Sequence, residues 1–177
     1  MERPFVVVSG LPASGKTTLG VRLAAALRLP LLDKDEILER LFESTADVRP
    51  RRALSRESDV ILQREACASE GAVLVSFWRV TGMAADSGTP VDWLTGLSKR
   101  IAHVHCVCDA ELAAERFLKR RRHARHLDSE TSPAQLRTNL HELCRLNPPS
   151  LGRRIDVDTS REYSMEAIIG AVRAALG

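Results

Sequence analysis

The sequence predicts an α/β fold: one domain over residues 1–177, with a five-stranded parallel sheet covered by helices on both faces. Two patterns predict it. Short, β-branched apolar runs alternate with segments of helical periodicity, which is typical of a parallel sheet built from strand and helix units. The chain of 177 residues, 44% of them hydrophobic, is also long enough for one buried core and short for two.

The strands are expected where apolar runs are short and bounded by turn residues. The first run, Phe5 to Val8, leads into a glycine-rich stretch, which places a strand end at a loop. The other apolar runs differ in length but are short as well. The predicted strands are residues 5–9, 30–32, 72–77, 101–108 and 154–157.

The helices are expected where apolar residues recur every three or four positions. The clearest case is the last one, whose stripe consists of Met165, Ile168, Ile169, Val172 and Leu176. Loops are expected at 44–50 and 81–90, and the sequence Asn147-Pro148-Pro149 should end a helix because proline cannot continue one. The predicted helices are residues 16–27, 35–42, 51–69, 110–122, 133–146 and 164–176.

Composition limits where the protein acts and what it binds. The net charge of +3 is too small to indicate nucleic acid by itself. No apolar run has the length of a signal peptide or a membrane span, so we expect a soluble, cytoplasmic protein without a membrane partner. The four cysteines show no CxxC spacing and fall in apolar segments, which predicts reduced core thiols at Cys67, Cys106, Cys108 and Cys144.

The stretch between the first strand and the first helix fits GxxxxGKT, the P-loop pattern. Its two glycines let successive backbone N–H groups point at phosphate oxygens, and the following helix directs its positive end to the same charge. Lys16 can then reach the β and γ phosphates, and the Thr17 hydroxyl can bind Mg²⁺. We therefore predict binding of ATP or GTP with Mg²⁺ by Gly10, Pro12, Ala13, Ser14, Gly15, Lys16, Thr17 and Thr18.

The sequence lacks the motifs of two large classes of P-loop proteins, the motor ATPases and the signalling GTPases. Motor ATPases need an acidic pair at the end of an apolar strand, and the strand Val73-Leu74-Val75-Ser76-Phe77 ends without a carboxylate. Signalling GTPases use NKxD and DxxG segments, and neither string occurs. What remains is phosphoryl transfer to a second substrate, in which the protein positions a hydroxyl and neutralises charge.

The arrangement resembles the small P-loop kinases, a group that includes nucleoside monophosphate kinases, gluconate and shikimate kinases, chloramphenicol phosphotransferase and polynucleotide kinases. The resemblance covers nearly the whole chain and implies the three-layer P-loop NTPase fold. The segment Leu32-Asp33-Lys34-Asp35-Glu36 looks like the corner where such kinases place an aspartate facing the acceptor hydroxyl. The resemblance assigns that catalytic role to Asp35 and lets Asp33 reach Mg²⁺ through water. Helix capping by Asp33 is the alternative.

A basic cluster follows at residues 115–126, and it resembles the lid of adenylate-type kinases. By that resemblance a small helical lid spans about 115–132, and Arg116 or Arg120 stacks on the base while the other grips the triphosphate. Lid closure would bring Arg120 and Arg122 onto the transferring phosphoryl group. A solvated basic helix face or a nucleic-acid patch is the alternative. The remaining basic side chains of the cluster are Lys119, Arg121 and Arg125.

Further candidates come from positions at strand ends. Arg79 occupies about the place of a substrate-binding arginine in nucleoside monophosphate kinases, and Trp78 either packs in the core or forms a wall for the acceptor. Arg52 belongs to an arginine-rich helix start that could contact an anionic acceptor. Thr159 follows the fifth strand, where this superfamily meets the nucleotide base. His103 and His105 share one strand face, but a zinc site is disfavoured because convergent ligands are missing.

The sequence thus predicts a Mg²⁺-dependent kinase that phosphorylates a hydroxyl of a small molecule, with antibiotics among the possible acceptors. Two alternatives remain, a polynucleotide or nucleoside 5′-hydroxyl kinase and a nucleotide-binding regulator without transfer activity. Nucleic acid is the less favoured partner because no aromatic stacking platform is evident. No oligomeric state is indicated.

Overall fold

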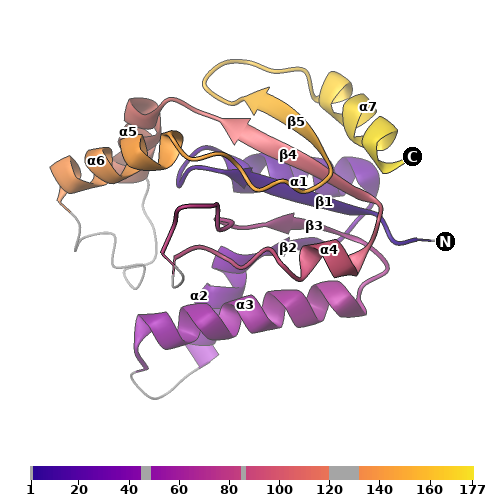
Figure 1. The fold of residues 1–177 in the computed structure, drawn as a ribbon, viewed down its shortest axis with the longest axis horizontal. Coiled ribbons are helices and arrows are strands. Elements are labelled where there is room, and N and C mark those ends of the chain that lie inside the picture. The colour runs from indigo at the N-terminus through magenta and orange to yellow at the C-terminus, as the bar shows by residue number, and fades with distance from the viewer. Residues whose placement is uncertain (1, 45–48, 85–86, 120–131) are drawn as a thin grey trace.

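The computed structural model describes residues 2–44, 49–84, 87–119 and 132–177. Within these ranges the strands form one parallel sheet in the order β2-β3-β1-β4-β5, with β1 at its centre (Figure 1). This arrangement confirms the predicted fold class. The strands are β1 (Phe5–Gly10), β2 (Leu31–Asp33), β3 (Ala72–Val75), β4 (Ile101–Val107) and β5 (Arg153–Asp158).

The long helices lie where the sequence periodicity predicts them, and their ends within the described residues agree or differ by at most two residues. One element was not expected, the short helix α4 (Leu94–Leu97), which lies in the connection after β3. The predicted residues 120–122 of the fourth long helix lie outside the described ranges. The helices are α1 (Lys16–Leu27), α2 (Lys34–Ser44), α3 (Arg51–Ala68), α5 (Ala110–Lys119), α6 (Pro133–Cys144) and α7 (Met165–Leu176).

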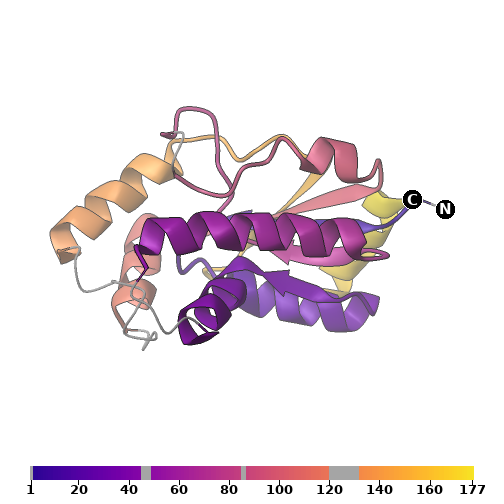
Figure 2. The same ribbon diagram turned by 90° about the horizontal axis from the view of Figure 1, so that it is seen from below.

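The core has two layers because side chains of β1 alternate between the faces of the sheet. Val6 and Val8 pack on one face with side chains of α1 and α7. Phe5 and Val7 pack on the other face with side chains of α2, α3 and α4. Figures 1 and 2 show the helices on both sides of the sheet, while α5 and α6 lie beyond the carboxyl ends of the strands. Because the strands are parallel, the loops that follow β1, β2 and β4 lie at the same edge of the sheet.

The cysteine expectation is half wrong. Cys106 and Cys108 are buried, but Cys67 and Cys144 are exposed. In α3 the inward stripe is carried by Leu62 and Ala66, which are four residues apart, so the next residue turns toward solvent. No helix among the described residues is long and apolar enough to cross a membrane.

Gly20 of α1 permits close approach of this helix to the sheet. A Cβ atom there would lie 2.5 Å from Cγ2 of Val75, whereas one at Gly170 of α7 would meet nothing within 4 Å. We therefore expect Gly20→Ala to lower the free energy of unfolding by about 1–2 kcal/mol, because overpacking against a stiff valine outweighs the gain in helix propensity. Urea denaturation of both variants measures the effect.

The matched control is Gly170→Ala, which should raise the free energy of unfolding by about 0.5–1 kcal/mol, since only the helix-propensity gain applies. Equal effects of the two substitutions would show that α1 does not depend on this close contact.

Candidate active site

The P-loop is a tight turn between β1 and α1. Gly10 and Gly15 have φ values of 141° and 91°, and Ala13 has a φ of 60°. A Cβ at Gly10 would lie 2.7 Å from the carbonyl oxygen of Cys106, so that position excludes any side chain. Lys16 Nζ donates to the carbonyl oxygen of Leu11 at 2.6 Å and so lies across the loop. Its ammonium group is held where phosphates would bind.

One side of the P-loop is fixed by the residue that follows β5. The Thr159 hydroxyl lies 2.7 Å from the Ser14 carbonyl oxygen and 3.0 Å from that of Val107, and it can donate to either. The Arg116 guanidinium donates to the Thr159 carbonyl oxygen at 2.9 Å. The structure thus brings Arg116 and Thr159 together beside the P-loop. Because the Thr159 hydroxyl is used within the protein, its clearest role is to support the loop.

The other side of the P-loop is fixed by the start of α2. Thr17 Oγ1 donates to Asp33 Oδ2 at 2.7 Å, and the Asp35 backbone N–H donates to Asp33 Oδ1 at 2.9 Å. Asp33 therefore caps α2 and contacts the P-loop at the same time, so the two roles considered from the sequence are compatible. The side chain is buried, with 3% of the residue exposed. Burial raises the pKa of Asp33, and the hydrogen bonds from Thr17 and Asp35 partly offset that rise.

The oxygen atoms of Thr17 and Asp33 fit Mg²⁺. This ion prefers hard oxygen ligands and is usually held by one or two protein groups together with substrate phosphates and water. Among the described residues no group of three or more His, Cys, Asp or Glu side chains could hold a metal ion by itself. A hydroxyl and one carboxylate would leave the other positions around such an ion to phosphate oxygens and water.

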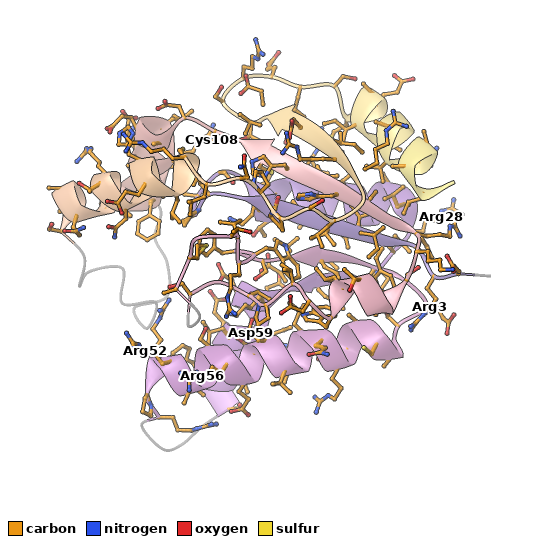
Figure 3. The ribbon with its side chains drawn as sticks, in the orientation of Figure 1. Arg3, Arg28, Arg52, Arg56, Asp59 and Cys108 are labelled. Atoms are coloured by element: carbon orange, nitrogen blue, oxygen red, sulfur yellow. The ribbon has the colours of Figure 1, made fainter. Side chains whose placement is uncertain are left out.

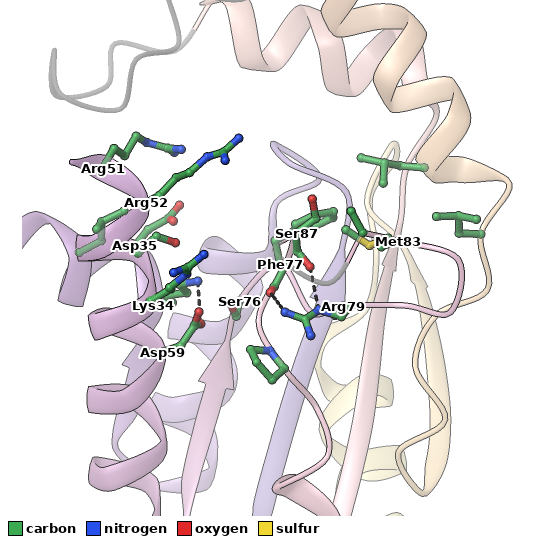
Figure 4. Close-up of a pocket in the computed structure, with 18 of the residues that line it drawn as sticks. Lys34, Asp35, Arg51, Arg52, Asp59, Ser76, Phe77, Arg79, Met83 and Ser87 are labelled. Carbon is green, nitrogen blue, oxygen red and sulfur yellow. Dashed lines mark hydrogen bonds and ion pairs between the residues drawn. The ribbon is translucent and has the colours of Figure 1, made fainter.

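A cleft of about 940 Å³ lies next to this corner, between α2, α3, α6 and residues 76–84 and 87–90. Figure 4 shows Asp35, Arg51 and Arg52 on one side of it and Phe77, Arg79 and Met83 on the other. Its volume is at the upper end of the range for small-molecule sites. The structure thus gathers three residues predicted for acceptor binding, Asp35, Arg52 and Arg79, around one cavity.

The cleft carries a surplus of positive charge. Lys34 Nζ and Asp59 Oδ1 form an ion pair at 2.6 Å, which ties α2 to α3. The Arg79 side chain donates to the Ser87 carbonyl oxygen at 3.0 Å and so braces the far wall. Figure 3 shows Arg52 and Arg56 near the amino-terminal end of α3. The charged lining residues are Lys34, Arg51, Arg52, Arg56 and Arg79 against Asp35, Asp59 and Glu142.

Trp78 takes the packing role and does not form a wall of this cleft. Only 2% of the residue is exposed, and its ring nitrogen donates to the Val8 carbonyl oxygen at 2.9 Å. The ring of Trp93 packs near it, with 6.2 Å between the ring centroids. The indole N–H finds a buried carbonyl partner on β1, which holds the ring in the core. A contact of Trp78 with an acceptor stays a prediction, because the residue lines a smaller cavity next to this cleft.

Several predicted residues lie outside the described ranges. They include Arg120 and Arg122, to which the sequence assigns lid and catalytic roles, together with most of the predicted lid. Their roles stay predictions. Of the basic cluster, Arg116 and Lys119 belong to α5.

The sequence did not predict that Ser9, His103 and His105 form one hydrogen-bonded chain. Ser9 Oγ lies 2.6 Å from His103 Nε2 and 2.8 Å from His105 Nδ1. The sequence correctly places both histidines on one strand face, but Ser9 comes from the neighbouring strand and is opposite His105 in the register of β1 and β4. Sequence reasoning on single elements does not supply that register.

Comparison with known proteins identifies the family. Residues 5–145, most of the chain, match the family AAA_33, described as "AAA domain". The chain belongs to this AAA domain family. It is also similar to the shikimate kinase of Corynebacterium jeikeium, with 41% identity over 73 residues, which are 40% of this chain and 40% of that protein. It is 52% identical to the shikimate kinase of Mycobacterium tuberculosis over 46 residues, which are 25% of this chain and 26% of that protein. The chain thus spans less than half the length of the curated relatives it matches.

Solved structures agree with the P-loop fold of this AAA domain protein. A protein of Chloroflexus aurantiacus, described only as a candidate kinase, is 28% identical with a TM-score of 0.73, covering 98% of this chain and 96% of that one. The shikimate kinase of Acinetobacter baumannii, solved with shikimate, has 19% identity and a TM-score of 0.56, covering 97% and 90%. The gluconokinase of Sinorhizobium meliloti has 18% identity and a TM-score of 0.53, and the match covers 98% of this chain and 91% of that one. The last two show the fold alone.

The raised pKa of Asp33 predicts a pH effect on stability. Aspartate in the unfolded chain titrates near 3.8, so the folded chain holds this proton to a higher pH and loses stability as pH rises through that window. The substitution Asp33→Asn retains both hydrogen bonds, because an amide oxygen can accept from Asp35 and an amide nitrogen can donate to Thr17. We expect the stability of Asp33→Asn relative to the native chain to increase with pH in the acid range, measured by urea denaturation without divalent cations.

Asp158→Asn serves as the control of opposite sign. Hydrogen bonds from Ser160 lower the pKa of Asp158, so its stabilising contribution is present at neutral pH and is lost as pH falls through the folded pKa. This variant should therefore lose stability relative to the native chain as pH rises. Parallel curves for the two variants would contradict the role given to the burial of Asp33.

Proposed function

We propose that this protein is a kinase that transfers the γ-phosphoryl group of ATP or GTP to a hydroxyl of a small molecule bound in the cleft. One observation carries the proposal. Asp33 contacts the P-loop residue Thr17, and Asp35, two residues later, lines the 940 Å³ cleft. The site for the triphosphate and the site for an alcohol therefore meet at one corner. The names of the curated relatives, shikimate kinases, support the same class of reaction.

The reaction requires in-line transfer between two oxygens. The Asp35 carboxylate is the proposed base: it accepts the hydroxyl proton while that oxygen forms a bond to the γ phosphorus. The bond from the γ phosphorus to the bridging oxygen breaks, and the nucleoside diphosphate leaves. Lys16 neutralises charge on the β and γ phosphates, and Mg²⁺, when bound beside Thr17 and Asp33, would stabilise charge on the same oxygens. Arg120 and Arg122 are proposed to add positive charge from the lid.

The surplus of cations in the cleft favours an acceptor with a negative charge. Arg51 and Arg56 contact no acidic side chain among the described residues, and both line the cavity that Asp35 faces. Guanidinium groups bind carboxylates and phosphates in a bidentate manner. A hydroxylated carboxylic acid or a phosphorylated alcohol is therefore the acceptor class we propose. Hydroxylated antibiotics stay within the proposal through the resemblance to chloramphenicol phosphotransferase.

A phosphotransfer screen tests the proposal. Purified protein with MgATP or MgGTP is incubated with hydroxylated acids, sugar acids, antibiotics and 5′-hydroxyl oligonucleotides, and products are detected by a mass increase of one phosphoryl group. A phosphorylated small alcohol supports the proposal. Phosphorylation of oligonucleotides alone would assign the polynucleotide kinase alternative, and triphosphate binding without any product would assign the regulator alternative.

Asp35→Asn should lower kcat by about 10²–10⁴-fold, the usual range for general base catalysis, with nucleotide affinity changed less than about threefold. The reason is that the amide keeps the size of the side chain but cannot take the proton. Steady-state kinetics and nucleotide titration measure the two quantities. Lys16→Ala is the comparison and should reduce both, because it removes charge at the phosphates. Equal losses of affinity and turnover in Asp35→Asn would contradict the role of base.

Arg56→Ala should raise KM for an anionic acceptor about tenfold or more, with a smaller change in kcat, because it removes a charge-assisted contact to the bound anion. Arg64→Ala is the matched control: the residue lies on α3 too, is exposed, and does not line the cleft. Initial rates over a range of acceptor concentrations measure the effect. If the two variants behave alike, the cleft does not select anions through α3.

A further inference from the structure

A second, smaller cavity of about 140 Å³ lies beneath the P-loop, at the carboxyl ends of β1 and β4. It adjoins the large cleft, because the same four side chains line both: Phe77, Met83, Leu143 and Leu146. In Figure 4 Phe77 and Met83 belong to the wall opposite Asp35. The small cavity is therefore on the far side of that wall, next to the proposed acceptor site.

The lining of this cavity is mostly apolar. Besides the four shared residues, the apolar lining includes Leu11 of the P-loop, the buried Trp78, and Pro148 and Pro149, which follow α6. An engineered apolar cavity of about 150 Å³ binds benzene. A volume of about 140 Å³ therefore matches a single five- or six-membered ring.

His105 supplies the notable polar group of the lining, and its protonation can be derived from its neighbours. Ser9 Oγ lies between His103 Nε2 and His105 Nδ1 and carries one proton, so it donates to one ring and accepts from the other. His103 is fully buried, and burial lowers its pKa to about 4, so the ring is neutral and bears one N–H.

The location of that proton follows from the other nitrogen of His103. Nδ1 is buried and has no hydrogen-bond partner among the described residues. A buried N–H without a partner is rarer than a buried acceptor without one, so the proton belongs on Nε2 and is donated to Ser9. Ser9 then donates its own proton to His105 Nδ1. His105 must consequently carry its proton on Nε2.

His105 Nε2–H is available for a ligand. Nδ1 is occupied by Ser9, whereas Nε2 has no partner among the described residues and is not sealed from solvent. Burial lowers the pKa of His105 too, and the nearby Lys16 and Arg154 oppose a charge on it while Asp156 favours one. The neutral ring of this lining residue therefore has one N–H donor, at Nε2, that no described residue accepts.

We propose that this cavity is a second subsite of the acceptor site, and that it takes a neutral, ring-sized part of the acceptor whose oxygen or nitrogen accepts a hydrogen bond from His105 Nε2–H. The inference rests on the proposed function, because it describes the same acceptor. It adds that the acceptor has two parts, a hydroxylated part at Asp35 and a neutral ring beneath the P-loop. His105 is then a specificity-determining residue.

Binding of two isosteric probes tests the subsite without turnover. Cyclopentanone carries a carbonyl acceptor, and methylenecyclopentane replaces that oxygen by a CH₂ group of similar shape. We expect cyclopentanone to bind the native protein and to shift the His105 Nε2 resonance in NMR spectra of ¹⁵N-histidine-labelled protein. Its affinity relative to methylenecyclopentane should fall about tenfold in His105→Leu, the effect of one hydrogen bond.

Two further variants keep the test decisive if His105→Leu does not fold. Ser9→Ala leaves the cavity in place but removes the group that holds the proton on Nε2, so it should reduce the preference for cyclopentanone. His105→Gln restores an N–H donor and should recover part of it. The proposal is overturned if neither probe binds, if the preference is the same in the native protein and all variants, or if the NMR spectra place the His105 proton on Nδ1.

The outcome is separable from that of the proposed function. Probe binding needs no nucleotide and no transfer. Phosphorylation of an alcohol in the screen together with no probe binding would reject the subsite alone. Probe binding with the predicted preference, but no phosphorylated product, would reject the kinase proposal and leave a ring-binding cavity.

Discussion

The hydrogen bond from Thr17 to Asp33 is the interaction on which the candidate site depends. It joins the first turn of α1, which carries the P-loop lysine, to the residue that caps α2, which carries Asp35. The Asp33 carboxylate accepts hydrogen bonds from two donors, a hydroxyl and a backbone N–H, that converge on it from different elements. Its burial is unfavourable by itself, as the raised pKa of Asp33 shows, and the two hydrogen bonds only partly compensate. The arrangement is thus more costly than ordinary capping, which is common where function constrains structure.

The parallel sheet explains why these groups can meet at all. Parallel strands bring their carboxyl ends to one edge, and ligands bind in the crevice outside that edge. β1 continues into the P-loop, β2 ends at Asp33, and β5 leads into Thr159, which supports Ser14 from the other side. The P-loop is therefore braced by Asp33 at the end of β2 and by Thr159 after β5, two strands on opposite sides of β1. A loop held in this manner can keep a strained φ at Ala13 without collapsing.

Local signals allowed much of the fold and part of the site to be predicted from the sequence. Periodicity located the long helices, and the GxxxxGKT string located the P-loop, because both are properties of contiguous residues. The unsuccessful predictions involve contacts between distant residues. The sequence left two roles open for Trp78, packing in the core or forming a wall for the acceptor, because its hydrogen-bond partner, the Val8 carbonyl, lies on another strand. The hydrogen-bonded chain of Ser9, His103 and His105 was missed for the same reason. The register of β1 against β4 cannot be derived from the sequence of either strand alone.

The charges around the cleft impose a condition on any acceptor. The γ-phosphoryl group is anionic, so a second anion placed near it raises the free energy of the complex unless positive charge lies between or around them. α3 supplies such charge at one end of the cleft, through Arg51, Arg52 and Arg56, while the smaller cavity at the other side is mostly apolar and is lined by His105. An acceptor that satisfies both ends carries its charge toward α3 and its neutral ring toward β4. Because Asp35 lies on the α3 side of the cleft, the hydroxyl of such an acceptor is then near its charged end.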